Sequence, residues 1–176
     1  LNSIGTGAIL IHQHTVGGNW NDGIAIYDSL LMSKCETVVL CYAQASSMSS
    51  ITIQAATARV LMPNTEFMVH YGFYGTEGIP SQVRSSVERY KKIDIEMLKM
   101  YARRCINGEF FQKKKMTEKE VIKFIENKIQ KHTDWFMDAN EAVYYGFADL
   151  IMGQDGLDSI DKLRVPSKKK HHDKRN

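Results

Sequence analysis

The 176-residue sequence has little cysteine, little proline and no long apolar run. Its three cysteines, Cys35, Cys41 and Cys105, are odd in number and show no paired spacing, which argues against a disulfide framework. It has no CxxC or CxxxH pattern, so we do not expect a structural zinc site. No stretch approaches the roughly 20 apolar residues that a membrane-spanning helix needs. We therefore do not expect a small disulfide-rich protein, a domain stabilised by zinc or a membrane-spanning protein.

The chain also has no large excess of positive or negative charge, since its net charge is only +3. Much of it lies in two basic runs, Lys113–Lys115 and Lys168–Arg175. The second run has no aromatic residues, so we interpret residues 166–176 as a solvated, disordered tail and expect no nucleic-acid partner. Residues 1–165 contain enough apolar residues for one domain with a single core. The first residues, Leu1–Gly5, fit neither a signal peptide nor a start methionine, so we expect a processed or incomplete N-terminus.

Apolar runs typical of strands alternate with segments of helical periodicity between Ala8 and Ile151. The predicted strands are Ala8–Ile11, Thr37–Cys41, Val60–Met62, Glu66–His70, Trp135–Met137 and Phe147–Ile151. The predicted helices begin at Asn19 or Asn21, within the serine run before Ile51–Ala58, at Pro80, at Thr117 and at Asp138. This alternation favours an α/β fold with a largely parallel sheet. We expect the helix-rich stretch Ser81–Gln130 to project from the core or lie across it.

The longest predicted helix, which starts at Pro80, carries an apolar stripe. The residues of this stripe are Val83, Val87, Tyr90, Leu98, Tyr101 and Cys105. Their spacing predicts one buried face along the whole helix.

A run of small residues, Ala45–Ser50, follows the strand predicted at Thr37–Cys41. A serine at the start of the next helix would lie near positive helix-terminus dipoles, and the N–H of Met48 would be free to stabilise an oxyanion. The same run also fits a helix cap with polar neighbours. It does not match the G-x-S-x-G elbow of α/β-hydrolases. Position alone leaves both interpretations open.

Weak signals of the same chemistry occur elsewhere in the chain. His70 ends an apolar strand, where a histidine often only completes a surface hydrogen bond. Asp134 precedes Trp135–Met137, where a partly buried carboxylate needs a partner, although a turn residue is equally compatible. Gly17 and Gly18 most commonly mark a turn. Together with a serine, these residues supply a nucleophile, a base, a carboxylate that orients the base, and backbone donors.

Four segments resemble the motifs of ClpP-type serine peptidases, in the order of that family. They are Val16–Asp28 (a Gly-Gly turn and a helix with Ile-Tyr-Asp), Ala45–Ser49 (Ala-Ala-Ser-Met), Met62–His70 (Leu-Pro-Asn…Met-Ile-His) and Asp134–Gly146 (Asp-Arg-Phe-Met…Tyr-Gly). The likeness extends from about Gly17 to Ile151. It implies the α/β fold of the ClpP/crotonase type, a spiral of ββα units, with a helical handle at residues 80–130.

The resemblance assigns catalytic roles to five residues. Ser47, which directly precedes Met48, is the implied nucleophile. His70 is the implied base, and Asp134 is the acid that orients it. The backbone N–H groups of Gly18 and Met48 are the implied oxyanion hole. This chemistry needs no metal and no organic cofactor.

The resemblance also implies how substrates and partners bind. Gly17, Tyr71, Gly72 and Phe73 are the implied substrate-binding residues, because the loop after His70 would present an edge to an extended peptide. The family forms stacked heptameric rings and works with an AAA+ ATPase that unfolds polypeptide substrates. We therefore expect a homo-oligomer, a heptameric ring or double ring, in the cytoplasm, with no membrane partner.

Several departures from the family pattern are visible. His14-Thr15-Val16 replaces the usual Asn-Ser-Pro before the glycine pair. The Ser47–His70 linker is shorter than usual, and the His70–Asp134 stretch is longer, which places an insertion in or beside the handle. These departures suit a divergent, virus-encoded member. The alternatives are a phage prohead maturation protease, a catalytically silent ring subunit, and a crotonase-type acyl-CoA enzyme.

Overall fold

The computed structural model describes residues 7–164, and these form a six-stranded sheet with helices packed against it. The N-terminal residues Leu1–Gly5 and the basic run that we interpreted as a disordered tail lie outside the described residues. The strands are β1 (Ile9–Thr15), β2 (Thr37–Ser46), β3 (Ala58–Leu61), β4 (Glu66–His70), β5 (Asp134–Met137) and β6 (Leu150–Ile151). All strand pairs are parallel except β4–β5, so the prediction of a largely parallel α/β sheet is confirmed.

Strand β2 is the centre of the sheet and pairs with three other strands. One edge of β2 pairs with β1. The other edge pairs with β3 through Val38–Cys41 and with β4 through Gln44–Ser46. Between these two segments Ala43 has a φ of 48°, and the register with β1 shifts. Such a bulge bends a strand, and here it divides β2 into a half that supports the core and a half that leads to Ser47.

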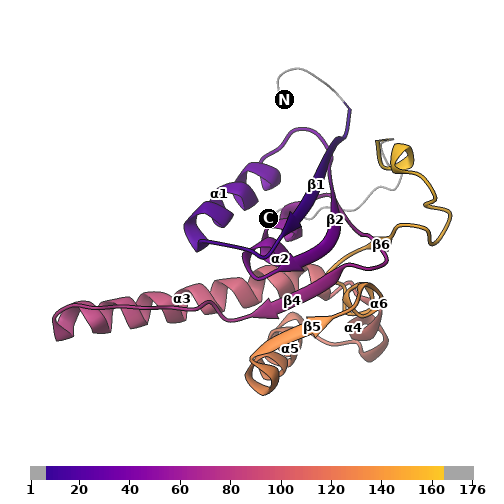
Figure 1. The fold of residues 1–176 in the computed structure, drawn as a ribbon. Helices are drawn as coiled ribbons and strands as arrows, with labels where there is room; N and C mark the ends of the chain where they lie inside the picture. Colours follow the sequence, from indigo (N-terminus) through magenta and orange to yellow (C-terminus); the bar gives the residue numbers. More distant parts are fainter. Residues whose placement is uncertain (1–6, 165–176) are drawn as a thin grey trace.

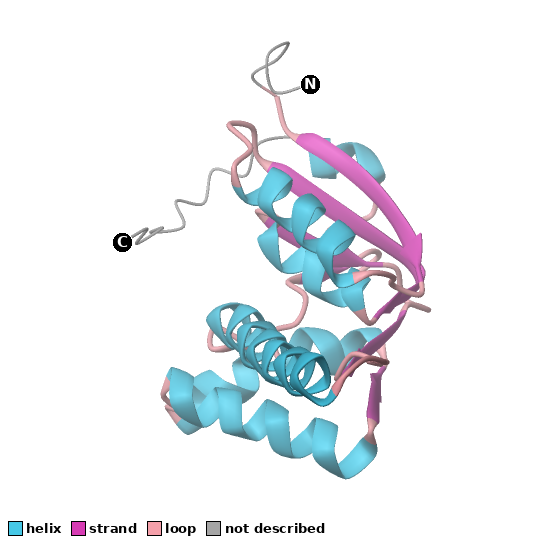
Figure 2. Cartoon of the chain, turned by 90° about the vertical axis from the view of Figure 1, so that its left-hand side faces the viewer, coloured by secondary structure: helices cyan, strands magenta, loops and turns pink. Residues whose placement is uncertain are grey.

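The helices are α1 (Trp20–Leu31), α2 (Met48–Thr52), α3 (Pro80–Cys105), α4 (Glu109–Lys114), α5 (Glu118–His132) and α6 (Ala139–Tyr144), with short 3-10 helices η1 (Ile53–Ala55) and η2 (Ile160–Arg164). Most of them lie on one side of the sheet (Figures 1 and 2). Side chains alternate along β2. Val39 and Cys41 belong to the large core between the sheet and these helices, whereas Val38 and Leu40 belong to a smaller cluster that includes Leu163. Burial on both faces explains why β2 has a continuous apolar sequence.

Two predicted elements are shorter in the structure. The helix expected through Ala58 ends earlier, because α2 passes into η1 and Ala58 already begins β3. The strand expected at Phe147–Ile151 is reduced to Leu150–Ile151, because Phe147 and Ala148 follow a glycine turn at Gly146 and pack in the core. None of the described helices is long and apolar enough to cross a bilayer.

The apolar stripe of α3 is buried only over its second half. Met97, Leu98, Tyr101 and Cys105 are buried, whereas Val87 is 41% exposed. Figure 1 shows the first half of α3 projecting from the body of the molecule. The later helices of the segment 80–130, α4 and α5, do not project in this way but contribute to the core. Their buried residues are Phe111, Val121, Ile125 and Ile129.

A buried arginine ties β3 to the turn before β6. Arg59 is 3% exposed, and its guanidinium donates to the Asp149 carboxylate, to Gln54 Oε1 and to the carbonyls of Gly146 and Phe147. Burial tends to raise the pKa of Asp149, but the charges of Arg59 and Arg104 and the bonds from Arg59 outweigh it, so the pKa is held below its usual range.

We expect the substitution Arg59→Met to lower the free energy of unfolding by about 3–5 kcal/mol. It removes both side-chain donors of the Asp149 carboxylate and leaves the buried Gln54 Oε1 and Gly146 carbonyl without their donor. Urea unfolding of both proteins measures the difference. The control is Arg103→Met, which removes an exposed arginine of α3 and should cost less than about 0.5 kcal/mol. Equal losses in the two variants would contradict a special role for Arg59.

The lowered pKa of Asp149 predicts a specific acid sensitivity. A carboxyl group with a depressed pKa in the folded state stabilises the protein above its unfolded pKa, near 4, and this stabilisation is lost as the pH falls through the folded value. We therefore expect Asp149→Asn to be less stable than wild type at pH 7 and to lose less stability below pH 4. Thermal unfolding from pH 7 to pH 2 measures both; parallel curves for the two proteins would refute the prediction.

Candidate active site

The pairing of three strands brings Ser47, His70 and Asp134 together. Ser46, the last residue of β2, pairs with Met68 of β4, and the Ser47 N–H donates to the Met68 carbonyl at 3.0 Å. His70 is the last residue of β4, and its partner in the antiparallel β5 is Asp134. Residues directly opposite each other in such a pair carry their side chains on the same face. The sheet register therefore fixes where these side chains lie.

The three side chains form a continuous hydrogen-bonded chain. Ser47 Oγ lies 2.7 Å from His70 Nε2, and His70 Nδ1 lies 2.9 Å from Asp134 Oδ1. An ionised carboxylate can only accept, so Nδ1 carries the proton and Nε2 is left to accept from the Ser47 hydroxyl. The His70 side chain is 24% exposed and that of Asp134 is 46% exposed. The arrangement can therefore remove a proton from Ser47 within reach of solvent and substrate.

Ser47 occupies a strained backbone conformation between β2 and α2. Its φ of 54° and ψ of −128° lie outside the regions that ordinary residues favour, at a cost of about 1–3 kcal/mol. The Ser47 carbonyl accepts from the N–H of Ser50 at 3.0 Å and from its hydroxyl at 2.6 Å, and the Ser50 hydroxyl also contacts Tyr101. A sharp strand–turn–helix of this kind presents a serine outward, as in a nucleophile elbow, although the G-x-S-x-G pattern is missing.

The glycine turn that precedes α1 packs directly against Ser47. A Cβ placed on Gly17, whose φ is 105°, would lie 2.7 Å from Ser47 Cβ, 2.8 Å from the Ser46 carbonyl oxygen and 2.9 Å from the Met48 nitrogen. Only a glycine permits this approach. Within the described part of the chain, no acceptor is bonded to the N–H of Met48 or of Gly18. Both N–H groups thus remain open to a further acceptor.

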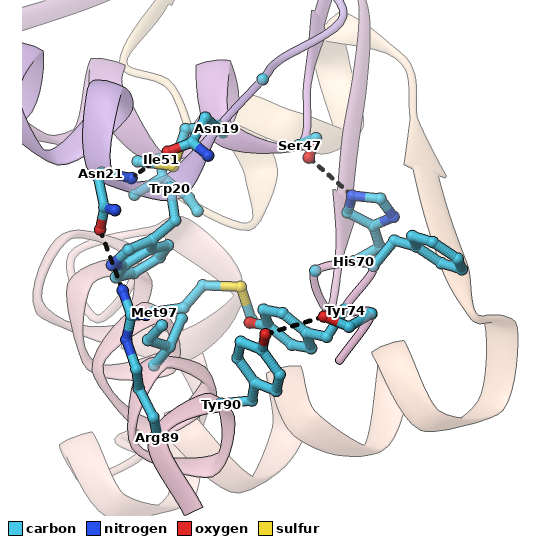
Figure 3. A pocket seen from close by; sticks show the side chains of 16 residues that line it. Asn19, Trp20, Asn21, Ser47, Ile51, His70, Tyr74, Arg89, Tyr90 and Met97 are labelled. Carbon is cyan, nitrogen blue, oxygen red and sulfur yellow. Dashed lines mark hydrogen bonds between the residues drawn. The ribbon is translucent and has the colours of Figure 1, made fainter. Parts of the chain in front are cut away.

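A cavity of about 450 Å³ opens beside Ser47 and His70 (Figure 3). Its volume lies within the range of ordinary ligand pockets. Of the implied oxyanion and substrate residues, Gly18, Met48, Gly72 and Phe73 line it. Gly17 and Tyr71 do not.

The structure gives Gly17 and Tyr71 different surroundings from those expected of substrate contacts. Gly17 supports the turn at Ser47, as its close approach requires. Tyr71 packs against the core, and burial raises its pKa to about 12. Because successive residues of an extended chain point to opposite sides, the residue after His70 turns its side chain away from the site.

Sequence reasoning missed much of the cavity wall. The far wall comes from the start of α1, with Trp20 and Asn21, and from one face of α3. The α3 residues are Arg89, Tyr90, Ile93 and Met97. Their helical spacing is visible in the sequence, but the apolar pattern predicts that Tyr90 lies on a buried stripe. Among the residues that the structure describes, no group of three metal-binding side chains occurs.

The loop after β4 is fastened to the projecting half of α3. The rings of Tyr74 and Tyr90 stack with centroids 4.2 Å apart. The Tyr74 hydroxyl donates to Asp94 Oδ1 at 2.9 Å, and the Tyr90 hydroxyl donates to the Gly75 carbonyl at 3.1 Å. This half of α3 therefore forms one wall of the cavity and also holds the loop that forms another.

We expect Gly17→Ala to disturb the turn at Ser47 as well as to strain the backbone, because the new methyl group meets backbone atoms that cannot move away. The measurement is the rate at which Ser47 reacts with a fluorophosphonate, together with the thermal unfolding temperature. Gly153→Ala is the matched control, since Gly153 has a φ of 85° but nothing within 4 Å of a new Cβ. Both variants should lose about 1–3 kcal/mol of stability, and only Gly17→Ala should slow the reaction. Equal reaction rates would refute the contact.

Comparison with known proteins finds similarity to the Clp protease family along most of the chain. The family model of Clp protease matches residues 3–155, which include the glycine turn, the strained serine, His70 and Asp134. The chain is also 27% identical over 145 residues to the ATP-dependent Clp protease proteolytic subunit of Oltmannsiellopsis viridis, an alignment that covers 81% of this chain and 67% of that protein. With a matching α/β fold, a family match over this span shows that the chain belongs to the Clp protease family.

Proposed function

We propose that the chain is a serine endopeptidase in which Ser47 attacks peptide carbonyls. The observation that carries the proposal is the unbroken hydrogen-bonded chain from Ser47 Oγ through His70 to Asp134 beside an open cavity. A cap serine would need neither a base at 2.7 Å nor a strained backbone, so these two features together favour a nucleophile over a helix cap. Because the chain belongs to a protease family, we infer that its substrates are peptides.

In the proposed reaction, His70 Nε2 takes the Ser47 proton as Oγ bonds to the substrate carbonyl carbon. Asp134 holds the imidazole by its Nδ1–H and stabilises the imidazolium that forms. The N–H groups of Met48 and Gly18 donate to the oxyanion of the tetrahedral intermediate. His70 then gives its proton to the leaving amine. In the second half of the reaction His70 takes a proton from water, the water oxygen attacks the acyl-enzyme, and His70 returns the proton to Ser47 Oγ.

We propose that an extended peptide lies along the loop formed by Gly72 and Phe73. Both residues line the cavity, and Phe73 is 98% exposed, so the loop edge is open to a partner. A peptide added along such an edge is held by backbone bonds whatever its sequence, while pockets select side chains. The cavity beside Ser47 would receive the side chain nearest the cleaved bond.

We further propose that the chain acts as a ring-forming subunit with an AAA+ ATPase. The support is the similarity to an ATP-dependent Clp protease proteolytic subunit, together with the shared family. Cleavage of folded proteins without any ATPase would instead favour a maturation protease that works unaided. Cleavage only of short peptides and unfolded chains fits the proposed partnership.

The test of the proposal is reaction with a fluorophosphonate, followed by mass spectrometry to locate the adduct and by peptide cleavage assays. We expect one adduct on Ser47, its loss in Ser47→Ala, and its persistence in Ser85→Ala, which removes an exposed serine of α3. Asp134→Asn should keep the fold but reduce kcat by about 10⁴-fold, because the imidazole takes the wrong tautomer.

Asp28→Asn, on the exposed side of α1, is the control for loss of a carboxylate. Absence of any adduct from the folded oligomer would indicate a catalytically silent subunit. Full activity of Asp134→Asn would remove Asp134 from the triad.

A further inference from the structure

We propose that Arg89 makes the cavity beside Ser47 selective for a carboxylate of the polypeptide substrate. This inference rests on the proposed function, since it concerns which peptides the same site prefers. Arg89 lies on α3 and Asn21 on α1. Figure 3 shows both across the cavity from Ser47 and His70.

The charge of the cavity wall is the first argument. Arg89 is the one arginine or lysine among the described residues that line the cavity, and no aspartate or glutamate is among them. The tyrosine hydroxyls of the wall already donate, Tyr74 to Asp94 and Tyr90 to the Gly75 carbonyl. Arg89 therefore contributes a positive charge to this wall that no carboxylate among the described lining residues neutralises.

The second argument is that Arg89 has no carboxylate partner elsewhere in the described part of the chain. No ion pair involves it among residues 7–164. On α3 the positions three and four residues away are Ser86 and Ser85 on one side and Lys92 and Ile93 on the other, so helix spacing supplies no acid either. Its one polar contact with the described residues is a long bond of 3.5 Å from Nη2 to Asn21 Oδ1.

The third argument concerns the chemistry that such a wall recognises. A guanidinium carries five N–H donors in a planar fork that matches a carboxylate, and one long bond to Asn21 leaves most of them free. Closer to Ser47 the wall is apolar, with Met48, Ile51 and Met97. A group with an apolar stem and a terminal carboxylate would satisfy both parts of the cavity at once.

Two parts of a polypeptide could supply this carboxylate. One is the side chain of a glutamate or aspartate near the cleaved bond, and the other is a free C-terminal carboxylate of a short substrate or product. Both present the same planar anion to Arg89. Because Arg89 is exposed and its charge is partly screened, we expect a preference of about five- to tenfold over the matching neutral group.

The experiment compares quenched peptides that differ only in Glu or Gln at one position near a single cleavage site, each with a free or amidated C-terminus. The kcat/KM ratio of acid to neutral peptide is measured for wild type, Arg89→Gln and Arg84→Gln. Arg84 is exposed on the same helix but does not line the cavity, so its variant controls for the loss of one charge. We expect the ratio to fall towards one only in Arg89→Gln. The pair of peptides that shows the preference identifies the source of the carboxylate.

A binding measurement separates this proposal from the proposed function. Fluorescently labelled versions of the same peptides are titrated into Ser47→Ala and Ser47→Ala/Arg89→Gln, and anisotropy gives Kd without any turnover. An Arg89-dependent preference in binding, even in a protein that cleaves nothing, supports the carboxylate site while the peptidase proposal fails. Cleavage with equal ratios in wild type and Arg89→Gln, or equal Kd values for acidic and neutral peptides, overturns the role of Arg89.

Discussion

The antiparallel pairing of β4 with β5 is the constraint on which the site depends. It sets His70 opposite Asp134, although 64 positions separate them in the chain. Register in a sheet is discrete, and a slip of one residue would turn every side chain of the strand to the other face. Phe67 and Met137, a buried pair in the same ladder, oppose such a slip because both would leave the core. Core packing therefore holds the imidazole and the carboxylate in contact.

A second constraint is the division of β2, which connects the core to Ser47. Its first half is fixed between β1 and β3, and its second half reaches β4 and ends at Ser46. The strained backbone of Ser47 persists because β4, α2 and the Gly17 turn surround it. Strain of this size is retained only where neighbouring structure over-determines it. The same crowding makes Gly17 a part of the site even though it does not line the cavity.

The two halves of helix α3 have different roles. Its buried second half belongs to the core, while its projecting first half forms a wall of the cavity and holds the loop after His70 through Tyr74 and Tyr90. A displacement of the projecting half would therefore reach the loop beside His70. The long segment between His70 and Asp134 is accommodated by α3, α4 and α5 without disturbing the strands that carry those two residues.

The sequence by itself determined the order of the elements, the parallel α/β character of the sheet and the capping of α1, α5 and α6, because these follow from local periodicity and capping chemistry. It also singled out Ser47, His70 and Asp134 through motif resemblance. Only the tertiary structure decided that these side chains meet, that Ser47 is strained, that Tyr71 faces the core, and that Arg89 and Met97 line the cavity. The reason is physical: hydrogen bonds across strands and contacts between distant helices depend on register and packing, which no local stretch of sequence encodes.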